Sequence, residues 1–144
     1  MKCLWALSRG QVSFLYSGDA MLSERSNRNL EGVHEHLVAV VRQADAITKM
    51  PFIITEGLRS EKRQRELFAK GLSKTLKSRH LTGHAVDFAP LLDGEVTWKT
   101  PAFLPVIAAF KKAAEELKIP IVSGGDWKSF KDFPHIELDR RVYP

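Results

Sequence analysis

The stretch SRHLTGHAVDF, residues 78–88, holds two histidines and an aspartate within eleven positions. A catalytic zinc ion usually takes three protein ligands from His, Asp or Glu and leaves its fourth position to water, so this stretch could supply part of such a site. Asp87 lies in the apolar run AVDF, where an unpaired acid is costly to bury. A buried aspartate is more often a hydrogen-bonding structural residue, so the stretch alone leaves both interpretations open.

A second polar group, DFPHIEL, follows near the C-terminus at residues 132–138. Asp132 precedes His135 by three residues, and alternation along a strand would place Glu137 on the same side as His135. If His135 is the third ligand of the metal, Asp132 could act as the general base for the attacking water. The competing interpretation is a surface loop in which Asp132 balances the charge of Lys131.

Two helices are predicted in the first half of the chain. Apolar residues recur every three or four positions from Asn29 to Thr48, which is typical of a helix that faces a core. His34 and His36 fall off this apolar stripe, so both are expected to face solvent. The next helix should begin after Ser60, whose side chain can cap it, and should end at Gly71.

A third helix and several short strands are predicted around the two polar groups. Pro101 suits the first turn of a helix. The buried face of that helix is expected to comprise Phe103, Leu104, Ile107, Ala108, Phe110, Ala114 and Leu117. Strands are predicted at 51–57, 85–92, 95–98, 119–125 and 135–138. The pattern therefore predicts an α+β domain, with a small antiparallel sheet packed against about three helices and the candidate site at the sheet.

The length of 144 residues and a hydrophobic fraction of 44% fit one compact domain, which we assign to residues 21–144. Residues 1–20 carry a short apolar run that Arg9 and Gln11 interrupt, and Met21 would make a natural start. We expect these residues to be a disordered extension, with an export signal or a weak membrane leader as the alternative. The chain lacks an apolar stretch of the ~18–20 residues that span a bilayer, so stable membrane insertion is not expected.

The charge and cysteine content narrow the classes of partner and metal site. The formal charge of +5 favours anionic partners, but the basic residues are scattered and form no nucleic-acid-binding motif. We therefore expect no dedicated nucleic-acid binding. The single cysteine, Cys3, excludes an internal disulfide and a cysteine-rich zinc finger. Any metal must therefore be held by His, Asp or Glu.

The two polar groups together resemble a known enzyme family. SRHLTGHAVDF followed by GGDW and DFPHIEL looks like the zinc peptidases of the VanY/VanX type. The resemblance is closest to the phage endolysins and bacterial wall hydrolases that are L-alanyl-D-glutamate peptidases, and it runs from about Leu30 to Leu138. Two blocks in the right order are far more specific than either block alone.

The resemblance implies a role for five residues. His80, Asp87 and His135 match the zinc ligands of the family, and Asp132 matches its catalytic carboxylate. Arg59 matches an arginine that contacts the substrate or its developing oxyanion, although a surface arginine beside a helix cap is the alternative. Ser78, Trp127 and His84 also fall within the motifs: Ser78 and Trp127 are expected to shape the pocket, and His84 to be a bystander.

The implied function is a zinc-dependent endolysin that cleaves the L-Ala–D-Glu bond of the peptidoglycan stem peptide. The alternatives are a D-Ala–D-Ala carboxypeptidase or dipeptidase of the same superfamily, and a non-catalytic, zinc-containing module that binds the wall. The expected setting is phage lysis, with a host remodelling enzyme as alternative. The protein would be made in the host cytoplasm and would act as a monomer on the wall in the periplasm, by an export route that the sequence leaves open.

Overall fold

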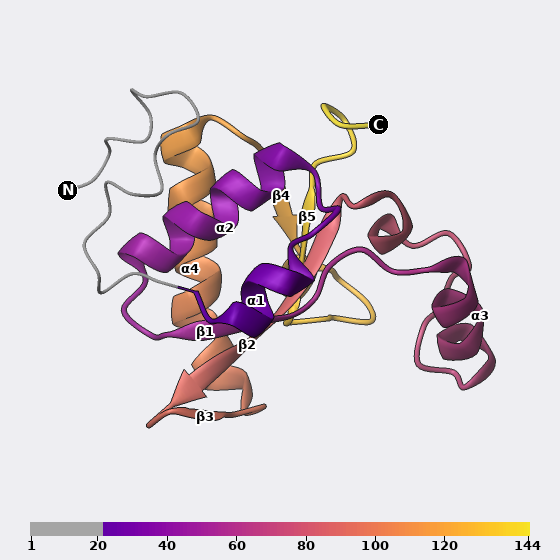
Figure 1. The fold of residues 1–144 in the computed structure, drawn as a ribbon, viewed down its shortest axis with the longest axis horizontal. Coiled ribbons are helices and arrows are strands. Elements are labelled where there is room, and N and C mark those ends of the chain that lie inside the picture. Colours follow the sequence, from indigo (N-terminus) through magenta and orange to yellow (C-terminus); the bar gives the residue numbers. More distant parts are fainter. Residues whose placement is uncertain (1–21) are drawn as a thin grey trace.

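The computed structural model describes residues 22–144 as an α+β structure, so the expectation for residues 1–20 lies outside the described part (Figure 1). Its helices are α1 (Glu24–Asn29), α2 (Glu35–Ile47), α3 (Glu61–Ala69) and α4 (Thr100–Leu117). Its strands are β1 (Phe52–Glu56), β2 (Ala85–Leu92), β3 (Glu95–Val96), β4 (Ile121–Ser123) and β5 (His135–Leu138). Two 3-10 turns, η3 (Arg79–Thr82) and η4 (Gly124–Asp126), precede β2 and follow β4. The predicted fold class is confirmed.

The sheet is antiparallel and runs in the order β1-β2-β5-β4, with β3 paired to the end of β2. Its register brings the two polar groups of the sequence together, because Asp87 of β2 pairs with His135 of β5. On the other side of β2, Glu56 of β1 also pairs with Asp87, next to an irregularity in the register. Asp87 therefore lies between an acid and a histidine.

One face of the sheet packs on α2 and α4 and the other carries the polar residues. Phe88 of β2 and Phe110 of α4 are fully buried, and their rings lie 5.2 Å apart. Ile136 and Leu138 of β5 join the same core. Successive strand residues point to opposite faces, so Asp87, His135 and Glu137 are directed away from this core. None of the helices between residues 22 and 144 is long and apolar enough to cross a membrane.

The helix predicted from Asn29 to Thr48 begins later in the structure, at Glu35 as α2, and the short helix α1, which the sequence did not predict, precedes it. Gly32 has a φ of +83°, a left-handed conformation that other residues rarely adopt, and it lies in the turn between α1 and α2. The side chain of His34 then accepts a hydrogen bond from the backbone N–H of His36 and caps α2. His36 is exposed as predicted, while His34 is partly buried.

The buried face of α4 also differs in part from the prediction. Leu104 is 53% exposed and Ala108 is exposed as well, whereas Val106, Ala109 and Ala113 are buried. The buried residues of α4 have the expected helical spacing, but they include Val106, Ala109 and Ala113 and leave Leu104 in solvent. The periodicity of apolar residues predicted the helix, whereas packing against the rest of the core determines which side of it is buried.

Asp45 on α2 should make stability depend on pH. Burial raises the pKa of Asp45 from 3.8 to about 6, against the opposing charge of Arg42. Because the folded-state pKa lies above the unfolded one, this group stabilises the fold only at low pH, and its contribution is lost as pH rises through 6. Asp45→Asn should remove this loss and raise the free energy of unfolding near neutral pH by about 1 kcal/mol, a value discounted for solvent screening.

Urea denaturation at about pH 4 and about pH 7 checks this expectation, because the difference between variant and wild type should grow with pH. Glu115→Gln, at an exposed position on α4, is the matched control and should not change the pH dependence. An equal loss of stability with rising pH in Asp45→Asn and wild type would contradict the role given to Asp45.

Candidate functional site

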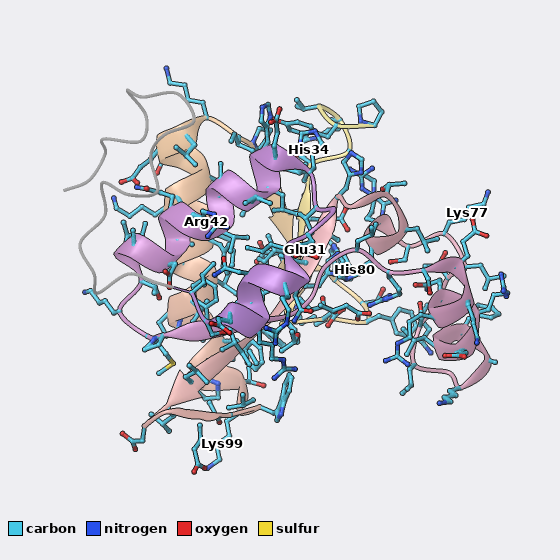
Figure 2. All side chains as sticks on the ribbon, viewed as in Figure 1. Glu31, His34, Arg42, Lys77, His80 and Lys99 are labelled. Atoms are coloured by element: carbon cyan, nitrogen blue, oxygen red, sulfur yellow. The ribbon has the colours of Figure 1, made fainter. Side chains whose placement is uncertain are left out.

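Three residues distant in the sequence converge at the polar face of the sheet. His80 comes from η3, Asp87 from β2 and His135 from the start of β5. The Oδ1 atom of Asp87 lies 3.3 Å from Nε2 of His80 and 3.4 Å from Nδ1 of His135. One ligand atom from each residue lies within 4.8 Å of the others. Figure 2 shows His80 between the sheet and the segment that carries α3.

The orientation of His80 is fixed by its own neighbourhood. The Ser78 side chain accepts a hydrogen bond from the backbone N–H of His80 at 3.1 Å and caps η3. The Nδ1–H of the His80 ring donates to the carbonyl oxygen of Gly57 at 2.8 Å, which leaves the lone pair of Nε2 facing Asp87. A Cβ at Gly57 would collide with the carbonyl oxygen of Asn29, so the close approach requires glycine. Ser78 thus shapes the site, as predicted.

His135 is oriented in the opposite sense, with Nδ1 facing Asp87. Its Nε2–H donates to Oε1 of Glu137 at 2.8 Å, because a carboxylate can only accept. Glu137 is itself buried and accepts from Nε of Arg140 at 3.0 Å. The ring of Trp127 lies 5.1 Å from the His135 ring and covers it. Carboxylate–histidine pairs of this kind fix the ring nitrogen that a metal meets.

The three residues fit a metal ion. Nε2 of His80 and Oδ1 of Asp87 are buried and have no hydrogen-bond partner. Unsatisfied buried polar atoms are rare in proteins, and a cation between them would satisfy both. Two imidazole nitrogens and one carboxylate oxygen are a donor set that zinc accepts. Within residues 22–144 this is the one group of three or more such side chains with suitable spacing.

The electrostatics of the group favour a cation as well. Burial works to raise the pKa of Asp87, but the adjacent His135 and His80 side chains outweigh it and hold that pKa well below its usual range. Burial works to lower the pKa of His135, yet the neighbouring Asp87 carboxylate and the hydrogen bond to Glu137 raise it to about 9. Asp87 and Glu137 thus carry negative charge that a proton on His135 balances, and a bound cation would take the place of that proton.

Asp132 lies beside this group, in the loop before β5. Its backbone N–H donates to the carbonyl of Gly124 at 3.0 Å, and its own carbonyl accepts from the N–H of His135 at 3.1 Å. A Cβ at Gly124 would collide with that carbonyl of Asp132, so the loop can close only over a glycine. Burial and the negative charge of Asp87 raise the pKa of Asp132, against His135, His80 and Arg59.

Arg59 lies next to Asp87, but its donors are engaged by the chain. Its guanidinium donates to both oxygens of Glu56, at 3.0 Å and 2.6 Å, and to the side-chain oxygen of Gln64 at 2.7 Å. One terminal nitrogen lies 3.7 Å from Oδ2 of Asp87, and the side chain is only 8% exposed. The structure thus brings Arg59 to the site as a buried neighbour of Asp87. Its backbone N–H also donates to the carbonyl of His80 at 3.0 Å.

Glu137, Glu56 and Gln64 surround the site, and the sequence prediction assigned them no role. Alternation along β5 placed Glu137 beside His135, and this was the available signal. No sequence pattern indicated Glu56 or Gln64, because both contact Arg59, which lies in a loop where residue spacing does not predict neighbours. His84 bonds Thr82 through Nδ1 at 2.7 Å and lies outside the His80–Asp87–His135 group.

Glu137 should tune the affinity of the site for a metal. Glu137→Ala removes the acceptor that orients His135, and loss of such an outer partner typically weakens metal binding about 10- to 100-fold. Glu137→Gln keeps an oxygen acceptor for the Nε2–H and should weaken binding less. Competition with a chromophoric chelator measures the affinity, with Glu31→Gln on the exposed surface as control. Unchanged affinity in Glu137→Ala would exclude this orienting role.

Comparisons with known proteins agree with this site. A family model described as phage L-alanyl-D-glutamate peptidase matches residues 19–143. The L-alanyl-D-glutamate peptidase of Escherichia phage T5 is 35% identical over 124 residues, which cover 83% of this chain and 90% of that protein. The peptidoglycan L-alanyl-D-glutamate endopeptidase CwlK of Bacillus subtilis is 33% identical, over 68% of this chain and 66% of its own.

A solved structure is similar over almost its full length. The crystal structure of the Serratia marcescens L-Ala D-Glu endopeptidase ChiX superposes with a TM-score of 0.83 and is 45% identical. The match covers 88% of this chain and 96% of that one. From the family match and these relatives, the chain belongs to the phage L-alanyl-D-glutamate peptidase family.

Proposed function

We propose that this protein is a zinc-dependent endopeptidase that hydrolyses the L-Ala–D-Glu bond of the peptidoglycan stem peptide. The observation that carries the proposal is the pair of buried, unpartnered atoms, Nε2 of His80 and Oδ1 of Asp87, beside Nδ1 of His135. Because the chain belongs to a peptidase family, a cation bound by these atoms would serve hydrolysis of a peptide bond. The bond is proposed from relatives that are named for it.

His80, Asp87 and His135 would hold the zinc ion through two nitrogens and one oxygen. Zinc, when bound, polarises the scissile carbonyl and lets water act as a nucleophile near neutral pH. The protein contributes the fixed direction of each donor: the Gly57 carbonyl holds His80, and Glu137 holds His135. Preoriented ligands avoid a reorganisation cost when the ion binds.

Asp132 is the proposed general base. Its carboxylate would take a proton from the attacking water and return it to the amine that leaves. Burial and the neighbouring charge of Asp87 raise the pKa of Asp132, which brings it closer to the working pH and favours transfer in both directions. Asp132 stands outside the metal-binding group, so it remains available for this step.

Arg59 is proposed to assist, as the resemblance implied, by stabilising negative charge that develops on the substrate. Its contacts support a further, positioning role, because it lies 3.7 Å from Oδ2 of Asp87 and is held by Glu56. Both roles involve the guanidinium group, whose Nε and one terminal nitrogen donate to Glu56.

The proposed organisation is a single catalytic domain over residues 21–144, acting as a monomer. One continuous core links α2, α4 and the sheet in the described residues, and the family match extends over 19–143. The proposed partner is the stem peptide of bacterial peptidoglycan and not nucleic acid. The proposed place of action is the wall in the periplasm, in phage lysis.

Chelation and reconstitution test the proposed function. Hydrolysis of purified peptidoglycan should stop after treatment with a strong chelator and should return when zinc is added back. Release of free D-alanine would instead indicate the D-Ala–D-Ala activity. Stoichiometric zinc without hydrolysis would contradict the proposal and favour a wall-binding module.

A further inference from the structure

The net positive charge of the chain, though not the basic residues themselves, is concentrated in one segment. Residues 61–77, here called the basic projection, hold six lysines and arginines and two glutamates. The whole chain has a net charge of +5, so these 17 residues supply four of the five charges. The six basic residues are all exposed: Lys62, Arg63, Arg65, Lys70, Lys74 and Lys77.

The basic projection extends away from the rest of the structure. Figure 1 shows α3 apart from the sheet and from α2 and α4, and Figure 2 shows Lys77 on this outlying part. Among the described residues, α3 does not pack extensively on any other helix or strand. Arg59 and Arg79, which flank the segment, are turned inward and are only 8% and 11% exposed. The projection can therefore meet a flat surface before the rest of the protein does.

Large apolar side chains are exposed on the same segment. Phe68 is 44% exposed, Leu72 72% and Leu76 50%. The loop that carries the two leucines folds back on α3, where the side-chain amide of Gln64 donates to the Thr75 carbonyl at 2.7 Å. Several exposed apolar side chains on one short segment are unusual and can mark an interaction site.

We propose that the basic projection is a docking surface for an anionic phospholipid bilayer. Lysine and arginine side chains would meet the phosphate headgroups, and Phe68, Leu72 and Leu76 would enter the boundary with the acyl chains. A soluble polyanion would complement the charges but would leave the two leucines exposed. The lipid surface is the partner that matches both the charge and the apolar side chains.

Such docking would hold the enzyme beside a membrane without inserting it, since no described helix could span a bilayer. His80 follows the projection directly in the sequence, so a docked projection would place the candidate site close to the membrane surface. The inference does not depend on zinc or on the bond that is cleaved.

Co-sedimentation of the full chain with vesicles tests the proposal. Vesicles of phosphatidylglycerol and phosphatidylethanolamine should bind the protein, and vesicles of phosphatidylcholine alone should not. Lys62→Gln/Lys70→Gln/Lys77→Gln should weaken binding at least about tenfold, because each cation near an anionic surface contributes. Leu72→Ser/Leu76→Ser should weaken it about tenfold through lost burial of apolar surface.

Matched controls carry the same changes elsewhere on the surface. Lys49→Gln/Lys99→Gln/Lys112→Gln removes the same charge, and Leu92→Ser/Leu104→Ser removes exposed leucines outside the projection. Both controls should bind like the wild type. Absence of binding to the anionic vesicles, or equal weakening in the controls, would overturn the proposal.

A second readout separates lipid from soluble polyanions. If Leu72→Ser/Leu76→Ser binds vesicles and heparin as tightly as the wild type, the surface senses charge alone and the lipid proposal is wrong. Hydrolysis of soluble stem-peptide fragments should be unchanged in both projection variants, because none of the substituted residues belongs to the candidate site. Unaltered hydrolysis with lost vesicle binding would support docking, whether or not the cleaved bond is the one proposed.

Discussion

Asp132→Asn should lose nearly all hydrolysis while the metal stays bound and the fold stays intact. Asparagine has the shape of aspartate but cannot accept the proton, and loss of a general base typically lowers kcat about 100- to 10,000-fold. Asp132 is not part of the group that would hold the ion, so the metal content should not change. Its backbone bonds to Gly124 and His135 do not involve the carboxylate, so the loop should keep its path.

Turnover of purified peptidoglycan, measured together with zinc content, checks this expectation. Asp126→Asn is the matched control, because Asp126 lies at the end of η4 in the same part of the chain and pairs with the exposed Lys111. It should hydrolyse like the wild type. If Asp132→Asn retained near wild-type turnover, the proton would have to be taken by another group.

His80→Ala should lose the metal first and hydrolysis as a consequence. Removal of a ligand should weaken zinc binding by more than the about 100-fold that loss of an outer partner costs. Binding of a metal to the folded state raises stability by mass action, so zinc should raise the Tm of the wild type and leave that of His80→Ala almost unchanged.

The control for this variant comes from the same motif. His84→Ala removes a histidine four positions away that bonds Thr82 and lies outside the candidate metal site. It should keep both the zinc-dependent rise in Tm and the hydrolysis. A zinc response that survives in His80→Ala and disappears in His84→Ala would reverse the assignment of ligand and bystander.

The convergence of the candidate site could be anticipated from local patterns. Alternation in β2 separates Asp87 from the core residues Val86 and Phe88, and alternation in β5 separates His135 from Ile136. Two strands with one polar face each must pair with those faces together if the apolar residues are to share a core. For this reason the approach of Asp87 to His135 follows from the pattern, and the antiparallel register provides it.

Other features depend on contacts between distant segments and leave no local trace. Gln64 is buried on α3, a largely exposed helix on which Leu67 is the other buried residue, and its amide group bonds Arg59 and the Thr75 carbonyl. A stripe of apolar residues cannot indicate such a position. The exposure of Leu104 depends likewise on which side of α4 the sheet covers.

Glycines show the same division between local and distant causes. The left-handed φ of Gly32, at +83°, explains the break between α1 and α2, and an isolated glycine in a helical pattern is a recognisable warning. The requirement at Gly57 comes from the carbonyl of Asn29, which is 28 positions earlier in the chain. Spacing and residue type predict which groups can react, whereas packing decides how rigidly they are held.

The central claim is that a metal held by His80, Asp87 and His135 serves cleavage of the L-Ala–D-Glu bond. Mass spectrometry of muropeptides tests it most directly, when peptidoglycan is digested by the protein in its zinc-loaded form and in its chelated form. The account predicts that the zinc-loaded protein releases peptides that begin with D-Glu and leaves L-Ala on the glycan, and that the chelated protein releases none. Loss of only a terminal D-Ala, or the same products with and without the metal, would contradict it.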